Sequence, residues 1–227
     1  MMGKRFDEYT VKLYSLSLIN LAKGEMTYRE LARVLGLTLH QLARYAKGWC
    51  TPSIPRAKYI IEKLEPIVGL EARVSKWMLS NDGFADAVEL VGNPYVLYLA
   101  GYDCLRRFAG YRVTKILSMN GEDLMLATAV ALRLMKPLVV VDSGGDDYVT
   151  YVSGDEIKRI GVYGDGIRKR DSVLIVDAVI RSGVETDALV RLVRNIGAEV
   201  AGVYNLVCYK GVRVPEDVRV ESVYRMG

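Results

Sequence analysis

The sequence has few of the residues that build metal centres and disulfide frameworks. Its 227 residues include one histidine, His40, and three cysteines, Cys50, Cys104 and Cys208, which lie far apart. There is no CxxC pair and no cluster of cysteine and histidine, so we expect neither a zinc site nor a disulfide framework, and no metal held by the protein's own side chains. The odd number of isolated cysteines favours a reducing cytoplasm.

Long apolar runs are also absent. The best candidate, residues 124–141, is interrupted by Arg133, Lys136 and Pro137, whereas a membrane-spanning helix needs about 20 consecutive apolar residues. The first residues, MMGKRFDEY, contain no apolar segment of the kind found in secretion signals. We therefore expect a cytoplasmic protein that does not interact with membranes.

The composition is that of a packed globular protein, with 51% hydrophobic and 26% charged residues. The charge is distributed unevenly. Residues 1–69 contain 11 Lys and Arg against 6 Asp and Glu, whereas the remaining residues contain 20 against 21. A basic N-terminal third indicates an anionic partner, although a solvated surface with a mild excess of positive charge would give the same count.

Two short amphipathic helices are predicted within this basic third, over residues 27–35 and 39–47. Thr27 and Glu30 have the spacing of a capping box, and Gly36 ends the first helix. Two short helices joined by a tight turn are typical of the helix-turn-helix motif, whose second helix presents polar and cationic side chains to bases and phosphates. The candidate DNA-binding residues are Thr27, Tyr28, Thr38, His40, Gln41, Arg44 and Lys47.

Residues 26–53, MTYRELARVLGLTLHQLARYAKGWCTPS, resemble the lambda-repressor/Cro-type helix-turn-helix. The resemblance covers the Leu-Ala pair, the turn glycine, the closing glycine and the following Pro-Ser. It implies that this part of the chain binds double-stranded DNA. A helical hairpin used for dimerisation or packing remains the alternative interpretation.

The rest of the chain is predicted to form an α/β domain. Apolar strands are expected over 115–119, 138–142, 172–177 and 199–207, and helices over 121–135 and 184–196. Strands that alternate with helices predict a parallel sheet with right-handed crossovers, in which ligands bind beyond the carboxyl ends of the strands. We therefore expect two domains, an all-α domain over 1–69 and an α/β domain over 70–227.

The sequence DAVIRSGVET, residues 177–186, follows one of the buried strands and leads into a helix that begins near Val184. A strand–turn–helix unit offers backbone N–H groups at the helix N-terminus, which is a ready site for a phosphate. Ser182 and Thr186 would add hydroxyl donors, and Arg181 would add a cation. The candidate ligand-binding residues are Asp177, Ala178, Val179, Ile180, Arg181, Ser182, Gly183, Val184, Glu185 and Thr186.

Residues 113–210 resemble the type I phosphoribosyltransferases. In that family, an apolar strand leads into two acidic residues, two aliphatic residues and a Thr/Gly-rich loop. The resemblance implies that the acidic pair holds the ribose hydroxyls, that the loop binds the 5′-phosphate, and that residues 119–123, MNGED, form the pyrophosphate loop. It adds Asn120 and Gly121 to the candidate ligand-binding residues and implies Mg²⁺ bound together with a phosphoribosyl ligand.

Three positions depart from the pattern of the family. The second acidic position is Ala178, Glu185 replaces a hydroxyl donor, and Asp142-Ser143-Gly144 stand where the family places basic residues. One donor to a developing charge is worth about 3–4 kcal/mol in a transition state. The departures together therefore predict a degenerate transferase that still binds its ligand.

The order of the two domains resembles that of archaeal helix-turn-helix–phosphoribosyltransferase regulators. We therefore predict a homodimeric DNA-binding transcriptional regulator whose second domain senses phosphoribosyl diphosphate or a nucleotide-like metabolite. The alternative is an active nucleobase or orotate phosphoribosyltransferase with an appended DNA-binding domain. A second domain that serves only for dimerisation is the third interpretation.

Overall fold

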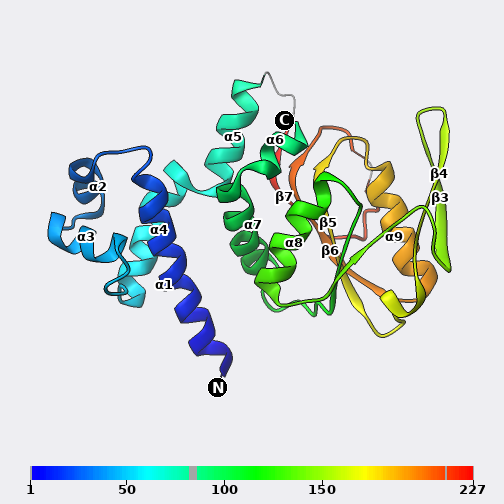
Figure 1. Ribbon diagram of the computed structural model, residues 1–227, viewed down its shortest axis with the longest axis horizontal. Coiled ribbons are helices and arrows are strands. Elements are labelled where there is room, and N and C mark those ends of the chain that lie inside the picture. Colours follow the sequence, from blue (N-terminus) through cyan, green and yellow to red (C-terminus); the bar gives the residue numbers. More distant parts are fainter. Residues whose placement is uncertain (1, 82–85, 213, 227) are drawn as a thin grey trace. The chain divides into compact units, whose positions relative to one another are not determined.

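A computed structural model describes residues 2–81, 86–212 and 214–226 (Figure 1). Contacts between residues divide the chain into two compact units, Met1–Arg73 and Val74–Gly227. Among the helices of the described residues, none combines the length and the apolar character that crossing a membrane requires.

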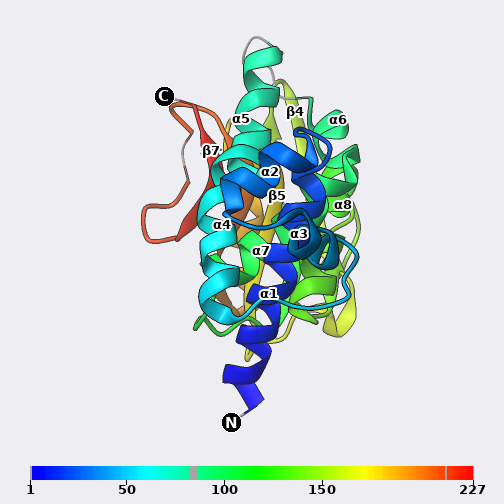
Figure 2. The ribbon, with the colours of Figure 1, turned by 90° about the vertical axis from the view of Figure 1, so that its left-hand side faces the viewer.

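The N-terminal unit contains the helices α1 (Met2–Ala22), α2 (Tyr28–Leu35), α3 (Leu39–Ala46) and α4 (Ile54–Val68), which are labelled in Figure 2. Helices α1 and α4 pack against each other, and Tyr14 Oη donates a hydrogen bond to Glu65 Oε1 at 3.0 Å. Leu31, Leu35 and Leu42 are fully buried. The core of this unit is therefore built from the apolar stripes of short amphipathic helices.

The turn between α2 and α3 is fixed by local interactions. Capping boxes begin both helices, one between Thr27 and Glu30 and one between Thr38 and Gln41. Gly36 ends α2 with a φ of 58°, in the left-handed region that glycine adopts without steric cost. The chain therefore leaves one helix and enters the next within three residues.

Helix α5 (Leu70–Ser80) crosses the division between the units, and α6 (Ala87–Gly92) and α7 (Pro94–Arg107) follow it. A buried carboxylate, Asp103, anchors α7 to the sheet. It accepts hydrogen bonds from Arg107 Nε at 2.6 Å and from Tyr204 Oη at 3.1 Å, and Arg107 also pairs with Glu221 at 3.1 Å. This pairing matters because a buried charge is costly unless it is compensated.

Five parallel strands form the central sheet, in the order β2-β1-β5-β6-β7. They are β1 (Lys115–Ser118), β2 (Leu138–Val140), β5 (Ser172–Ile180), β6 (Glu199–Cys208) and β7 (Val220–Arg225). Helix α8 (Glu122–Leu134) connects β1 to β2, and α9 (Val184–Ile196) connects β5 to β6. In Figure 1, α7 and α8 lie on one side of the sheet and α9 lies on the other. The predicted parallel α/β architecture is confirmed.

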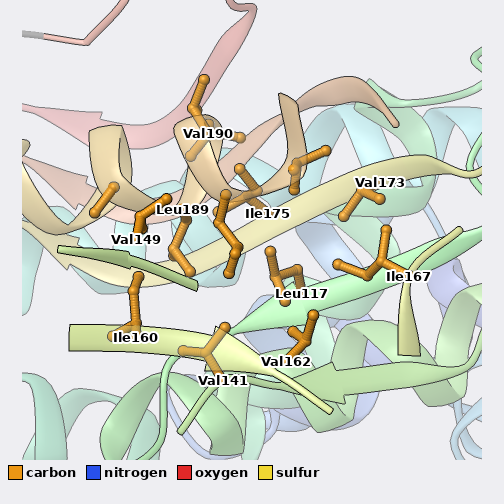
Figure 3. Packing of buried hydrophobic residues seen from close by; sticks show 14 of the residues in the cluster. Leu117, Val141, Val149, Ile160, Val162, Ile167, Val173, Ile175, Leu189 and Val190 are labelled. Carbon is orange, nitrogen blue, oxygen red and sulfur yellow. The ribbon is translucent and has the colours of Figure 1, made fainter. Parts of the chain in front are cut away.

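The strands β3 (Asp147–Ser153) and β4 (Glu156–Val162) form a separate antiparallel hairpin. It packs against α9, where Val149 and Ile160 join Leu189 and Val190 in one apolar cluster (Figure 3). All residues of β5 are buried, because helices cover both faces of the sheet at this strand. The hairpin and α9 therefore form a wall beside the carboxyl end of β5.

Candidate functional site

A cavity of about 210 Å³ lies where β5 ends and α9 begins. Its position beyond the carboxyl end of a parallel strand is where α/β sheets usually bind ligands. The cavity is lined by Ser153, Asp177, Val179, Ile180, Arg181, Ser182, Gly183, Glu185 and Thr186. Of the ten residues predicted in this loop, Ala178 and Val184 do not line it. Ser153, which the sequence did not single out, comes from the end of β3.

The loop between β5 and α9 has the backbone form of an anion site. Gly183 takes a φ of 81° and immediately precedes α9, and the N–H of Asp187 donates to its carbonyl oxygen at 2.8 Å. The first N–H groups of a helix lack acceptors within the helix, and the helix dipole is positive at this end. The loop can therefore hold a phosphate by its backbone.

Asp177 is buried beside this loop, and Thr186 Oγ1 donates a hydrogen bond to its Oδ2 at 2.8 Å. Burial raises the pKa of Asp177 to about 6, with the hydrogen bond from Thr186 acting in the opposite direction and the charge of Glu185 adding to the increase. An ionised carboxylate accepts hydrogen bonds only, which suits a sugar hydroxyl as its partner.

Glu185 is exposed in the first turn of α9 and interacts with the hairpin. The pKa of Tyr151, on β3, is raised first by burial and then by the charge of Glu185 and a side-chain interaction with it. The carboxylate that departs from the family's pattern is therefore engaged with the hairpin wall.

Asp123 lies in the first turn of α8, and its Oδ1 accepts a hydrogen bond from the backbone N–H of Ala178 at 2.7 Å. Burial raises the pKa of Asp123 to about 8, and the negative charge of Asp177 contributes next, followed by smaller effects of Glu122 and Glu185 against the lowering effect of the Ala178 N–H. The sequence analysis placed Asp123 in the pyrophosphate loop, through the resemblance over residues 119–123, and not beside the ribose. The available signal was an acidic residue just after the first strand, in a chain that lacks an acid at position 178.

Asn120 and Gly121 follow β1, whose carboxyl end lies at the same edge of the sheet as that of β5. Asn120 Oδ1 accepts a hydrogen bond from the N–H of Gly121 at 2.9 Å, and Gly121 has a φ of 89° before α8 begins. Both residues are exposed, and neither lines the cavity. Asp142, which follows β2, is bonded by the N–H of Ser143 at 2.6 Å.

The predicted DNA-binding residues fall into two groups. The side chains of Thr27, Thr38 and Gln41 take part in the two capping boxes. The others are exposed on or near α2 and α3: Tyr28, His40, Arg44 and Lys47. The Lys47 ammonium lies 4.5 Å from the ring centroid of Trp49, and that of Lys23 lies 5.6 Å from the ring centroid of Tyr28. The outer face of α3 thus presents cationic and hydrogen-bonding side chains to solvent.

Within the ranges that the structure describes, no three His, Cys, Asp or Glu side chains are grouped so that they could hold a metal ion. Mg²⁺ readily keeps several waters and is often bound through one or two carboxylates together with phosphate oxygens of the substrate. The donor set present here fits an ion that arrives with a diphosphate better than one held by the protein alone.

Comparison with known proteins gives relatives for more than half of the chain, although no protein-family model matches it. The chain is 28% identical over 183 residues to a xanthine phosphoribosyltransferase of Moorella thermoacetica, covering 74% of this chain and 92% of the relative. It is 30% identical over 127 residues to an adenine phosphoribosyltransferase of Photorhabdus laumondii, covering 52% of this chain and 67% of the relative. A crystal structure of adenine phosphoribosyltransferase from Rhodothermus marinus matches with a TM-score of 0.57 and 29% identity, over 63% of this chain and 86% of that one.

These matches confirm the resemblance to phosphoribosyltransferases and correct the functional prediction. The predicted transcriptional regulator with a degenerate, ligand-sensing second domain is wrong, because the relatives are transferases named for the bases on which they act. None of the three is described as a regulator. The prediction treated Ala178 as the loss of a carboxylate, whereas the fold places Asp123 against that position.

Proposed function

The chain belongs to the phosphoribosyltransferase family, and from this premise we propose that it transfers a phosphoribosyl group from 5-phosphoribosyl 1-diphosphate to a purine base. A ring nitrogen of the base would form a bond to C1 of the sugar, while the bond from C1 to the diphosphate oxygen breaks. Diphosphate leaves with the electron pair of that bond, and the base releases its N–H proton to solvent. The proposal depends chiefly on the cavity at the end of β5, where a buried carboxylate adjoins a phosphate-binding loop.

Each part of this cavity has a role in the proposal. Asp177 accepts a hydrogen bond from a ribose hydroxyl, and Thr186 orients the carboxylate by donating a hydrogen bond to its Oδ2. Ser182, Gly183 and the start of α9 hold the 5′-phosphate. Asn120 and Gly121, at the end of the neighbouring strand, are assigned to the diphosphate, with which Mg²⁺ enters the site.

The purine is the class of base named in both relatives, adenine in one and xanthine in the other. The test is release of diphosphate from 5-phosphoribosyl 1-diphosphate with adenine, xanthine, hypoxanthine, guanine and orotate in parallel, in the presence of Mg²⁺. We expect turnover with at least one purine and none with orotate. Turnover with orotate alone would overturn the choice of base, and no turnover with any base would overturn the transferase.

The N-terminal unit is assigned a second function, binding to double-stranded DNA, because the outer face of α3 presents Arg44 and Lys47 to solvent at the end of a fixed helical turn. This function accompanies the transferase and is independent of it. A homodimer would supply the two half-sites that a short recognition helix needs for discrimination. The three cysteines are unpaired, which agrees with a cytoplasmic location.

An Arg44→Ala variant is expected to bind DNA from the region upstream of its own gene roughly 5- to 100-fold more weakly, since one base contact is worth about 1–3 kcal/mol. Fluorescence anisotropy at several salt concentrations measures the effect. Lys58→Ala is the matched control, because Lys58 is exposed on α4 and its removal changes the net charge equally. Equal weakening in both variants would show a nonspecific effect of charge, and unchanged affinity would remove Arg44 from the interface.

A further inference from the structure

The ribose subsite lacks the second acid at the position where the family has it. Successive side chains of a strand point to opposite faces of the sheet. Asp177 points to the α9 side, because its carboxylate is bonded by Thr186 of that helix. The next position therefore points to the α8 side, and there the chain has only the methyl group of Ala178.

Helix α8 supplies a carboxylate on that same side. Asp123, in its first turn, reaches the strand so closely that its Oδ1 accepts the N–H of Ala178 at 2.7 Å. The carboxylate of Asp123 thus contacts the backbone of Ala178, the position that carries the second acid in the family. Asp123 therefore contacts the strand one residue beyond Asp177.

A structural role alone does not account for an aspartate here. The bond to the Ala178 N–H requires only one acceptor oxygen, which the amide of asparagine offers equally well. An ionised carboxylate placed close to Asp177 instead incurs repulsion and desolvation, in agreement with the raised pKa of Asp123. Groups held in unfavourable electrostatic surroundings are concentrated at functional sites.

We propose that Asp123 takes the place of the missing second acid, so that Asp177 and Asp123 each accept a hydrogen bond from one of the two neighbouring hydroxyls of the ribose. The inference rests on the proposed transferase function and assigns to it a residue from a different element of the fold. It makes the site selective for a sugar that carries both hydroxyls, with Asp123 as a specificity-determining residue.

The test is calorimetric binding of 5-phosphoribosyl 1-diphosphate, ribose 5-phosphate and 2-deoxyribose 5-phosphate to the full chain at pH 8.5. We expect Asp123→Asn to bind the first two at least about tenfold more weakly and to lose much of the preference for ribose 5-phosphate over its deoxy counterpart. Removal of a negative charge by itself would tighten the binding of these anions, so weaker binding indicates a lost contact. Asp217→Asn is the matched control, since it makes the same change at an exposed carboxylate that pairs with Arg194 at 2.6 Å outside the cavity, and it should bind as tightly as the wild type or more tightly.

The double variant Asp123→Asn/Ala178→Asp moves the carboxylate to the strand and is expected to recover most of the lost affinity. If the double variant fails to fold, the ribose-to-deoxyribose preference of the single variant decides the question. Binding by Asp123→Asn that equals the wild type in strength and in preference would overturn the role of Asp123 and leave the transferase intact. A wild-type protein that binds none of the three ligands would overturn the transferase itself.

Discussion

An Asp177→Asn variant is expected to lose at least about 100-fold in kcat/KM for 5-phosphoribosyl 1-diphosphate, the range seen when one preorganised hydrogen-bonding group is removed from a reaction centre. Asparagine keeps the size of the side chain and an oxygen that can accept from Thr186, but it loses the charge that strengthens a hydrogen bond to a ribose hydroxyl. The fold should survive, because the substitution removes a buried ionisable group. Steady-state rates at saturating purine measure the effect.

Asp187→Asn is the matched control for this variant. Asp187 lies in the first turn of the same helix, is half-buried, and pairs with Arg191 at 2.9 Å outside the cavity. Its loss should change the rates little, because exposed ion pairs contribute at most about 1 kcal/mol and this pair does not touch the substrate. If the two variants were equally active, Asp177 would have no part in the reaction.

An Asp123→Asn variant is expected to be more stable than the wild type at pH 8 and equally stable near pH 4. The pKa of Asp123 is raised to about 8 in the folded protein from an ordinary value of 3.8, so the folded state binds the proton more tightly than the unfolded state does. The free energy of unfolding of the wild type therefore falls as the pH rises from about 4 to about 8. Asparagine does not titrate, so the variant does not undergo this decrease. At about 1.4 kcal/mol per pKa unit, even half of the shift would stabilise the variant by at least about 2 kcal/mol at pH 8.

Urea unfolding at pH 4.5, 6 and 8 measures this difference, and Asp187→Asn should follow the wild type throughout. If the free energy of unfolding varied with pH in the same way for Asp123→Asn and the wild type, Asp123 would have an ordinary pKa in the folded protein. A gain in stability together with weaker ligand binding would identify Asp123 as a residue kept for function at a cost in stability.

The sequence predicted the elements whose signals are local. The apolar run from Ser172 to Asp177 predicted a buried strand, and the capping-box spacing of Thr27 and Glu30 predicted where one helix begins. The packing of the β3–β4 hairpin on α9 was not predictable, because that contact joins residues far apart in the chain.

The functional prediction failed for a related physical reason. Counting acids at consecutive sequence positions cannot detect a carboxylate that reaches the same place from another element, as Asp123 does through its bond to Ala178. The network of Asp103, Arg107 and Tyr204 was also unpredictable, since it joins α7 to β6, which lie far apart in the chain.

The central place of β5 in the sheet affects the order in which the chain folds during synthesis. In this strand Val173 pairs with Lys115 on one side and with Val200 on the other, so the middle of the sheet joins segments made at very different times. Until β5 has been made, β1 and α8 lack their main partner in the sheet, whereas all residues of α1 to α4 have long been made. We expect the N-terminal unit to fold first and the sheet to close late, in a step slowed by its non-local pairings. Newly made chains would then pass through a stage in which the helical unit is folded and the apolar edge of β1 is still open to chaperones.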